Sequence, residues 1–319
     1  MQHPIQVSEA PYFLGFDGGG TKTACILADP EGLVLAQAST GPSNPIRAGF
    51  ARAWFSLGEA ADCVLAQRKI RAGHIRAICA GLGGTGSPSA KRSVTQFFKR
   101  GFPNALVHVT TDLEIALEAA FGPGEGIVLL AGTGSAAFGR DANGHTQRAG
   151  GRGPWFSDEG SAFDIGRRAI GAALRAEEGR SQETQLTKRI LDWHQARDWD
   201  ALLEQASKRP DEFFPKTFPL VAQLADAGDV VSCELMMEAA VSLARLAGSV
   251  VTGLGWNDGE APIAKIGGVY GRSKLFDAAI ETELKKVLPQ ARLVSAKLSP
   301  VEASIQMAIR LSRAQGNAA

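Results

Sequence analysis

One glycine-rich turn between two apolar runs occurs twice in this chain. The first copy runs from Phe13 to Ala28 and contains three consecutive glycines, 18–20. Apolar runs joined by so tight a turn predict two neighbouring antiparallel strands. A shift of 112 positions aligns four residues of the first copy and the turn after it with the second, without a gap: Gly20 with Gly132, Thr21 with Thr133, Asp29 with Asp141 and Gly32 with Gly144. Four matches in register predict two similar halves, each opening with the same β-meander.

The first turn has the composition of a phosphate site. Glycines let the backbone approach a ligand closely, and the amides of such a turn form a nest for anions. Thr21, Lys22 and Thr23 add two hydroxyls and a cation, and Asp17 ends the entering strand where a carboxylate is suited to hold a hydrated Mg²⁺. The shift places Asp17 on Leu129, so we predict two phosphate-facing turns and one metal site. For either copy alone, an ordinary hairpin turn is the alternative.

The rest of the chain alternates strand and helix patterns, which predicts an α/β fold. A length of 319 residues is enough for two domains. We expect further strands at 33–35, 75–80, 106–109, 263–266 and 293–294, and helices at 46–69, 89–100, 113–121, 230–251 and 300–313. Residues 181–227 are also predicted to be helical. A further helix reaches Arg175, with Ser157 as its N-cap. The segment 230–251 is apolar almost all round, which indicates a buried or interface helix.

Composition excludes several classes of partner. The formal net charge of +1 gives no case for nucleic acid or an anionic membrane. Residues 1–11 lack the apolar run of a signal peptide, and no run approaches transmembrane length. The cysteines are scattered, without a CxxC pair, and are expected to be packed thiols in a reducing compartment: Cys25, Cys63, Cys79 and Cys233. We therefore expect a cytoplasmic protein.

Two further glycine motifs favour other nucleotide sites only weakly. Residues 15–23 approach a Walker A loop, but Thr21 separates the last glycine from the lysine and the segment continues as a strand. Residues 81–86 match GxGxxG between a strand and a helix, with Asp112 at the end of the next strand. Because this motif does not follow the first strand of the chain, a dinucleotide site is the less favoured interpretation.

Three glycine turns at strand ends, taken together, resemble the actin-like ATPase superfamily. They are residues 17–23, 131–135 and 267–271, which are similar to its phosphate-1, phosphate-2 and adenosine motifs in the same order. Within that superfamily the chain most resembles the N-acetylglucosamine and glucosamine kinases of the BadF/BadG/BcrA/BcrD ATPase family. The additional matches are at 43–45, 111–112 and 157–162. The resemblance spans nearly the whole chain, and the motifs are specific only jointly.

The resemblance implies an ATP-dependent hexosamine kinase that transfers the γ-phosphate to a 6-hydroxyl. It implies two actin-like (ribonuclease H-like) lobes, each a mixed sheet flanked by helices, with ATP in a cleft between them. The lobes are expected at 1–117 plus 300–319 and at 118–299. Asp112 is similar to the catalytic base, and Asp17 to the magnesium ligand. The implied sugar ligands are Asn44, Asp112, Gly151 and Asp158. The implied ATP ligands are Gly18, Gly19, Gly20, Thr21, Lys22, Thr23, Gly132, Thr133, Gly134, Ser135, Gly267, Gly268 and Tyr270. We also expect a homodimer.

Departures from related sequences leave some alternatives open. The cysteine-rich zinc motif of ROK sugar kinases is absent, which excludes that branch. In mammalian N-acetylglucosamine kinases a Trp occupies the place of Arg152, so the choice between an acetylated and a free amine stays open. The rival function is an ATPase that activates a CoA-ester dehydratase through an iron–sulfur cluster, which would need cysteines at a subunit interface. A sugar sensor without turnover is a third possibility, which the presence of Asp112 disfavours.

Overall fold

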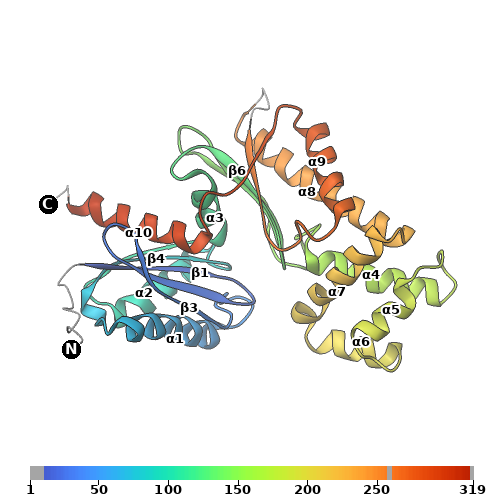
Figure 1. The fold of residues 1–319 in the computed structure, drawn as a ribbon, viewed down its shortest axis with the longest axis horizontal. Helices are drawn as coiled ribbons and strands as arrows, with labels where there is room; N and C mark the ends of the chain where they lie inside the picture. Colours follow the sequence, from blue (N-terminus) through green and yellow to red (C-terminus); the bar gives the residue numbers. More distant parts are fainter. Residues whose placement is uncertain (1–10, 257–260, 317–319) are drawn as a thin grey trace, which may run out of the picture. The chain divides into compact units, whose positions relative to one another are not determined.

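The structure, a computed structural model, describes residues 11–256 and 261–316 (Figure 1). The chain forms two compact units, here unit 1 (Met1–Pro123 with Lys297–Ala319) and unit 2 (Gly124–Ala296). The expected lobe boundary at 117/118 would fall inside helix α3 (Asp112–Phe121), which belongs to unit 1. The segment 1–10, most of the stretch that lacks a signal-peptide pattern, lies outside the described residues.

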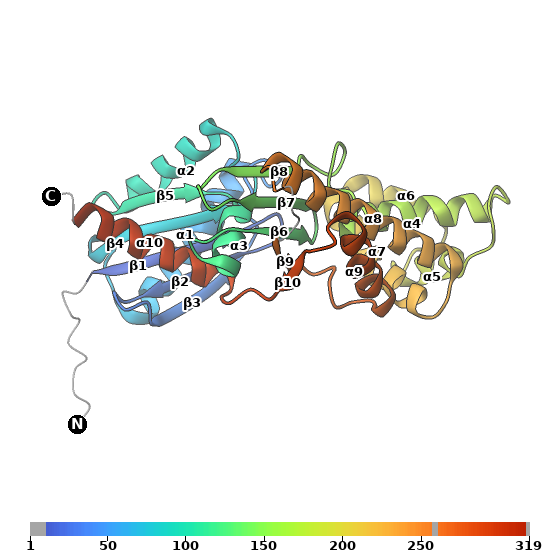
Figure 2. The same ribbon diagram turned by 90° about the horizontal axis from the view of Figure 1, so that it is seen from above.

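Unit 1 is built on a mixed five-stranded sheet in the order β3-β2-β1-β4-β5 (Figure 2). The strands are β1 (Tyr12–Gly18), β2 (Thr23–Ala28), β3 (Val34–Thr40), β4 (Ile75–Leu82) and β5 (Leu106–Thr110). β1 to β3 form the predicted antiparallel meander, and β4 and β5 continue the sheet in parallel with β1. The carboxyl ends of β1, β4 and β5 therefore meet at one edge, where Asp17 and Asp112 lie.

Helices cover both faces of this sheet (Figure 1). On one face, α1 (Phe50–Arg68) and α2 (Pro88–Gly101) bury a core that includes Leu14 and Phe16 of β1. On the other, α3 and the final helix α10 (Pro300–Gly316) pack on Phe13 and its neighbours. A short 3-10 helix, Ala72–His74, precedes β4. The last helix of the chain thus packs on the sheet of the first unit.

Unit 2 repeats the topology of unit 1. Its sheet order, β10-β9-β6-β7-β8, is the same arrangement read from the other edge (Figure 2). The strands are β6 (Gly126–Ala131), β7 (Ser135–Arg140), β8 (Thr146–Gly150), β9 (Pro262–Ile266) and β10 (Arg292–Val294). β6 to β8 are antiparallel, whereas β9 and β10 run parallel to β6. The predicted internal repeat is therefore a repeat of structure.

The turns after β2 and β7 match in their hydrogen bonds. Asp29 Oδ1 accepts the backbone N–H groups of Glu31 and Leu33, and Asp141 Oδ1 accepts those of Asn143 and His145. Two positions with φ near +87° and +84°, Gly32 and Gly144, close these turns on the carbonyls of the aspartates. Positive φ is the reason for a glycine at both positions.

Unit 2 carries an additional group of helices. They are α4 (Ala162–Glu177), α5 (Leu186–Trp193), α6 (Trp199–Lys208), α7 (Pro210–Asp226), α8 (Val230–Gly253) and α9 (Lys274–Val287). α8 packs on β6, β7 and β8, which explains its mostly apolar sequence. α4 and α7 pack closely because Gly166 faces the carbonyl of Phe214, where a Cβ would clash. The helical stretch predicted at 181–227 is three helices.

Two local predictions are wrong. The N-cap of α4 is Ser161, whose hydroxyl accepts the N–H of Asp164 at 3.1 Å, and not Ser157. Asp158 and Gly160 have φ of 72° and 76°, so the chain turns again before the helix begins. The cysteines were all expected to be packed, but Cys63 is exposed on the outer face of α1, whereas Cys25 and Cys79 are buried and Cys233 is partly buried.

Within the described residues, no helix is both long and apolar enough to cross a membrane.

Candidate active site

The first glycine turn is held in shape by backbone hydrogen bonds. Gly19 N–H donates to the carbonyl of Lys22 at 3.0 Å, and the Gly19 carbonyl accepts the N–H groups of Ser43 and Asn44 at 3.1 Å. Thr21 and Lys22 are exposed, which suits contact with a ligand. Thr23 differs from them, because it is fully buried and its hydroxyl donates to the Gly41 carbonyl at 2.7 Å. The Thr23 hydroxyl therefore joins β2 to the chain at Gly41, directly after β3.

Asp17 lies at the end of β1, between β2 and β4. Burial and, to a smaller extent, the negative charge of Asp112 raise the pKa of its carboxyl to about 6, against the opposing effect of Lys22. The carboxylates of Asp17 and Asp112, predicted to act in metal binding and catalysis, are therefore close enough to interact electrostatically. Bringing two carboxylates together in a partly buried place favours a cation between or beside them.

Asp112 begins helix α3, directly after the end of β5. Thr111 is the N-cap and forms a capping box with Glu114: the Glu114 N–H donates to the Thr111 hydroxyl at 3.2 Å, and the Glu114 carboxylate accepts the Thr111 N–H at 2.9 Å. A carboxylate in the first turn of a helix is stabilised in its ionised form by the helix dipole. Asp112 thus lies in the first turn of α3, at the sheet edge where the parallel strands end.

Asn44 faces Asp112 across the loop that follows β4. Its side-chain oxygen accepts the N–H groups of Ile46 and Arg47 at 3.0 and 3.2 Å, which fixes the side chain. A Cβ placed on Gly83 would lie 3.2 Å from both Asn44 Nδ2 and Asp112 Oδ2. The structure thus brings together three of the predicted residues of unit 1, Asp17, Asn44 and Asp112.

The GxGxxG motif of residues 81–86 takes part in this arrangement. Gly83 N–H donates to the Gly18 carbonyl at 2.8 Å, which joins the loop to the first glycine turn. Gly84 has a φ of 81° and packs against the Asn44 side chain. The sequence singled out this motif only as a weak dinucleotide signal. Its proximity to Asn44 and Asp112 depends on the parallel pairing of β1, β4 and β5, which the motif alone does not reveal.

The second glycine turn, in unit 2, is also internally bonded. Gly132 N–H donates to the Gly134 carbonyl at 2.9 Å, and the Gly132 carbonyl accepts the N–H of Ala162 at 2.8 Å. Gly132, Thr133 and Gly134 are partly exposed. Ser135 is buried and its hydroxyl donates to the Glu159 carbonyl at 2.7 Å. Like the Thr23 hydroxyl in unit 1, the Ser135 hydroxyl thus bonds a neighbouring segment of the chain, here the turn before α4.

The third glycine turn follows β9 and lies beside the second. Val269 N–H donates to the Ala131 carbonyl at 3.0 Å, and Gly267, with a φ of 120°, approaches that carbonyl too closely for any side chain. Gly268 is exposed. The Tyr270 hydroxyl donates to the Leu129 carbonyl at 3.2 Å, and burial raises the pKa of that phenol well above its ordinary value. The two predicted nucleotide turns of unit 2 are thus neighbours.

The predicted sugar ligands of unit 2 lie between β8 and α4. The carbonyl of Gly151 accepts a hydrogen bond from the Arg148 guanidinium, which also bonds the Gly150 carbonyl at 3.1 Å. Asp158 is only 2% exposed and has a φ of 72°, a conformation that is strained for a residue other than glycine. Arg152 is exposed. A buried acid in a strained turn is typical of a functional position.

A family comparison decides the affiliation of the chain. The sequence profile of the BadF/BadG/BcrA/BcrD ATPase family matches residues 14–302. The chain belongs to this family. Its two mixed sheets, each opening with the same meander, are the actin-like architecture that the resemblance implies.

Two relatives and a solved structure are similar to this chain over most of its length. The N-acetylmuramic acid/N-acetylglucosamine kinase of Clostridium acetobutylicum is 28% identical over 291 residues, which cover 90% of this chain and 94% of that one. The glucosamine kinase of Vibrio cholerae is 26% identical over 73% of this chain and 78% of its own. A Chromobacterium violaceum structure, proposed to be an N-acetylglucosamine kinase, is 26% identical with a TM-score of 0.76, covering 94% and 99%.

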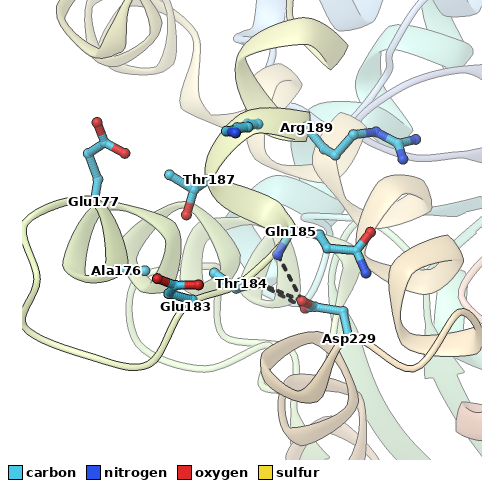
Figure 3. Close-up of a pocket in the computed structure, with 9 residues that line it drawn as sticks. Ala176, Glu177, Glu183, Thr184, Gln185, Thr187, Arg189 and Asp229 are labelled. Atoms are coloured by element: carbon cyan, nitrogen blue, oxygen red, sulfur yellow. Dashed lines mark hydrogen bonds between the residues drawn. The ribbon is translucent and has the colours of Figure 1, made fainter.

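A hollow of about 680 Å³ lies elsewhere in unit 2, beside α4, α5 and the start of α8 (Figure 3). Its lining includes none of the residues that the sequence predicts for nucleotide or sugar. Figure 3 shows the Asp229 carboxylate bonded to Thr184 and Gln185. The same carboxylate caps α8 through Ser232, and these hydrogen bonds outweigh burial and lower its pKa. Asp229 therefore has a structural role in this family member.

Proposed function

We propose that the protein is an ATP-dependent kinase that phosphorylates the 6-hydroxyl of an amino sugar. The observation that carries the proposal is the pairing of Asp112 with Asn44 across Gly83, next to the glycine turn that follows Asp17. Family membership supports ATP as the phosphate donor. The relatives named above are kinases of N-acetylglucosamine, N-acetylmuramic acid or glucosamine, which supports an amino sugar as the acceptor.

In this proposal Asp112 is the general base. It accepts the proton of the acceptor hydroxyl as that oxygen attacks the γ-phosphate, and such a base contributes roughly 10²–10⁴-fold to the rate. The remaining contribution is positioning and charge stabilisation, as in other phosphoryl transfers. Asn44, Gly151 and Asp158 are proposed to bind the sugar. The glycine turns at 18–22, 132–134 and 267–268 are proposed to bind ATP.

Asp17 is proposed as the ligand of Mg²⁺. Among the described residues there is no group of three or more His, Cys, Asp or Glu suited to a metal. A nucleotide-bound Mg²⁺ needs only one or two carboxylates besides phosphate and water, so a single acid fits. The crowding of two negative charges, which contributes to the pKa of about 6 at Asp17, fits a place for a cation. When bound, the ion would neutralise charge on the phosphates.

The test is a screen of ATP consumption with purified protein. The acceptors are N-acetylglucosamine, glucosamine, N-acetylmannosamine, muramic acid derivatives and glucose, with the product identified by mass spectrometry and phosphorus NMR. We expect a 6-phosphate of one amino sugar. We expect Asp112→Asn, which keeps the shape but removes the proton acceptor, to lose at least about 10²-fold in kcat while still binding ATP and sugar. Near-normal kcat in this variant would remove Asp112 from the role of base.

The cysteines disfavour the rival function, activation of a dehydratase through an iron–sulfur cluster. Such a cluster is held by four thiolates. Cys63 is exposed, whereas Cys25 and Cys79 lie in the sheet interior and Cys233 is only partly exposed. Two copies of Cys63 would supply two ligands. Brown colour and iron in the anaerobically purified protein, with no sugar-dependent turnover, would revive this alternative.

Assembly and location belong to the same proposal. We propose a homodimer, which multi-angle light scattering would distinguish from the mass of one chain. A cytoplasmic location is proposed because ATP and amino sugars are available there, and fractionation of cells that express a tagged chain would check it.

A further inference from the structure

One carboxylate oxygen, Oε2 of Glu114, gathers the polar groups of the two residues that precede Asp112. It accepts the N–H and the hydroxyl of Thr111, both at 2.9 Å, and also the hydroxyl of Thr110. Lys91 of α2 lies 3.7 Å from the same oxygen. Burial opposes ionisation of Glu114, but these hydrogen bonds and Lys91 outweigh it and hold the pKa of the carboxyl below its usual range. Glu114 is therefore an anion at neutral pH.

The same strand end is also fixed from the β4–α2 loop. The buried hydroxyl of Thr85 lies 2.7 Å from the Thr110 carbonyl and 2.6 Å from the Leu82 carbonyl, and its one proton is shared between them. Thr110 is itself only 1% exposed. The Thr110 carbonyl thus accepts a hydrogen bond from the β4–α2 loop, and the Thr110 hydroxyl donates one to Glu114. The chain that enters Asp112 is bonded on both sides.

These bonds exceed what is needed to begin a helix. A capping box needs one bond from the N3 backbone to the cap side chain and one from the cap N–H to the N3 side chain, and both are present here. Glu114 additionally accepts two hydroxyls, one of them from the strand residue Thr110. The additional bonds fix the orientation of the strand end relative to the helix, and with it the position of Asp112.

We propose that Glu114 is a positioning residue, which holds Asp112 at the point where it takes the proton of the acceptor hydroxyl. The proposal rests on the function proposed above. A catalytic group must be held within about 0.5 Å of its productive position, and a misplacement of about 1 Å can reduce a rate by as much as about 10²-fold. In this proposal Glu114 acts through Asp112 and not by contact with the substrate.

The experiment compares two acids of the same helix. Glu114→Ala removes the bonds to Thr110 and Thr111, and we expect kcat to fall about tenfold, with the KM for ATP unchanged. Glu114→Gln keeps the shape and one acceptor oxygen and should recover part of the loss. Glu118 is the matched control, because it is a buried acid of α3 that pairs with Arg310 of α10. We expect Glu118→Gln to lower Tm and to leave kcat within about twofold, since its bonds do not reach Asp112.

Thr110→Val gives an independent measurement, because it removes the hydroxyl and keeps the carbonyl that Thr85 bonds. It should lower kcat, and its effect in the Glu114→Ala background, where the bond to Thr110 is already lost, should be smaller than in the wild type. Normal kcat in Glu114→Ala, equal kcat losses in the Glu114 and Glu118 variants, or fully additive effects of Thr110 and Glu114 would each overturn the proposal. A wild-type protein without sugar-dependent turnover, or an active Asp112→Asn, would instead reject the proposed function.

Discussion

Gly83 sets the separation of two polar side chains at the candidate acceptor site. A methyl group there would lie 3.2 Å from both Asn44 Nδ2 and Asp112 Oδ2, so both would have to move by a few tenths of an ångström. Gly83 is not among the residues with positive φ, so its backbone accepts alanine. The position is thus restricted by its neighbours and not by its own conformation.

We therefore expect Gly83→Ala to lower kcat about tenfold, because both side chains shift together, while Tm changes little. Steady-state kinetics with the identified acceptor would measure kcat, and the KM for ATP should stay the same. Gly101→Ala is the control, since a Cβ at that position has no neighbour within 4 Å among the residues that the structure describes. Unchanged kcat in Gly83→Ala would show that the acceptor site tolerates the methyl group.

Asp17 is predicted to destabilise the protein in the absence of metal. Its pKa rises from 3.8 to about 6, chiefly through burial, so the folded state binds its proton more tightly than the unfolded state does. Stability contributed by this group is therefore complete at low pH and is lost as pH rises from about 4 to about 6. At neutral pH the raised pKa of Asp17 thus lowers the free energy of unfolding by about 3 kcal/mol, compared with its contribution at low pH.

Asp17→Asn removes this penalty. In EDTA at pH 7.5 we expect the variant to unfold at a higher temperature than the wild type, by up to about 3 kcal/mol in the free energy of unfolding, and the gain should vanish near pH 4. Calorimetry at several pH values measures the gain at pH 7.5 and its disappearance near pH 4. The variant should also lose Mg²⁺-dependent use of ATP and keep sugar binding. A lower Tm at pH 7.5 would contradict the assigned burial effect, and an unchanged Mg²⁺ requirement would contradict the metal role.

At the scale of residues, the sequence identifies candidate residues but not their contacts. Asp17, Asn44 and Asp112 were identified from motifs, and the structure brings them together. Glu114 was overlooked, although the pattern Thr111-x-x-Glu114 is a recognisable capping box. Its bond to Thr110 needs the geometry of the strand end. The inward hydroxyl of Thr23 could not be predicted either, because the turn alone does not say which face of β2 is buried.

Strand β1 and helix α10 illustrate a restriction at the scale of elements. Gly15 lies in the middle of β1, where a Cβ would meet the Ser304 hydroxyl, Ile305 at 2.9 Å and the Val301 carbonyl at 3.0 Å. The final helix thus approaches the first strand more closely than any side chain would permit. This contact joins the two ends of the chain within unit 1.

We expect Gly15→Ala to lower the free energy of unfolding by about 1–3 kcal/mol, the usual range for an extra methyl group in a well-packed place. Urea unfolding followed by circular dichroism measures it. Ser304→Ala in the same chain should recover a part of the loss, since the nearest obstacle is the Ser304 hydroxyl. Gly73→Ala, with no neighbour within 4 Å, is the control. Equal stability of Gly15→Ala and the control would mean that α10 does not pack against β1 as described.

The order and type of the elements were largely readable from the sequence, because the repeat aligns strands that follow the same hydrophobic pattern. The matching turns at Asp29 and Asp141 extend this agreement to single hydrogen bonds. Helix ends were less predictable. The N-cap of α4 was expected at Ser157 and lies at Ser161, since the positive φ of Asp158 cannot be read from the residue type. Residue patterns determine elements, whereas caps depend on the local path of the chain.

At the scale of the whole molecule, the repeat raises the question of whether one half or both halves bind nucleotide. Each unit contributes one turn with an accessible threonine, Thr21 in unit 1 and Thr133 in unit 2. The metal acid occurs only in the first, since Leu129 occupies the corresponding position in the second. The proposed function assigns both turns to ATP, with amides and one hydroxyl from each for the phosphates.

We accordingly expect Thr21→Val and Thr133→Val each to weaken binding of a non-hydrolysable Mg²⁺–ATP analogue by about tenfold, the effect of losing one hydrogen bond to a charged group. A ligand at about 100 times its Kd stabilises the wild type by about 2.7 kcal/mol, and each variant should lose about half of that gain. Differential scanning fluorimetry over a range of analogue concentrations measures the shift. Thr282→Val on α9 is the control, since the Thr282 hydroxyl donates to the Ala278 carbonyl of its own helix. If Thr133→Val behaved like the control while Thr21→Val did not, nucleotide would be bound by unit 1 alone, and the second copy of the turn would have a structural role only.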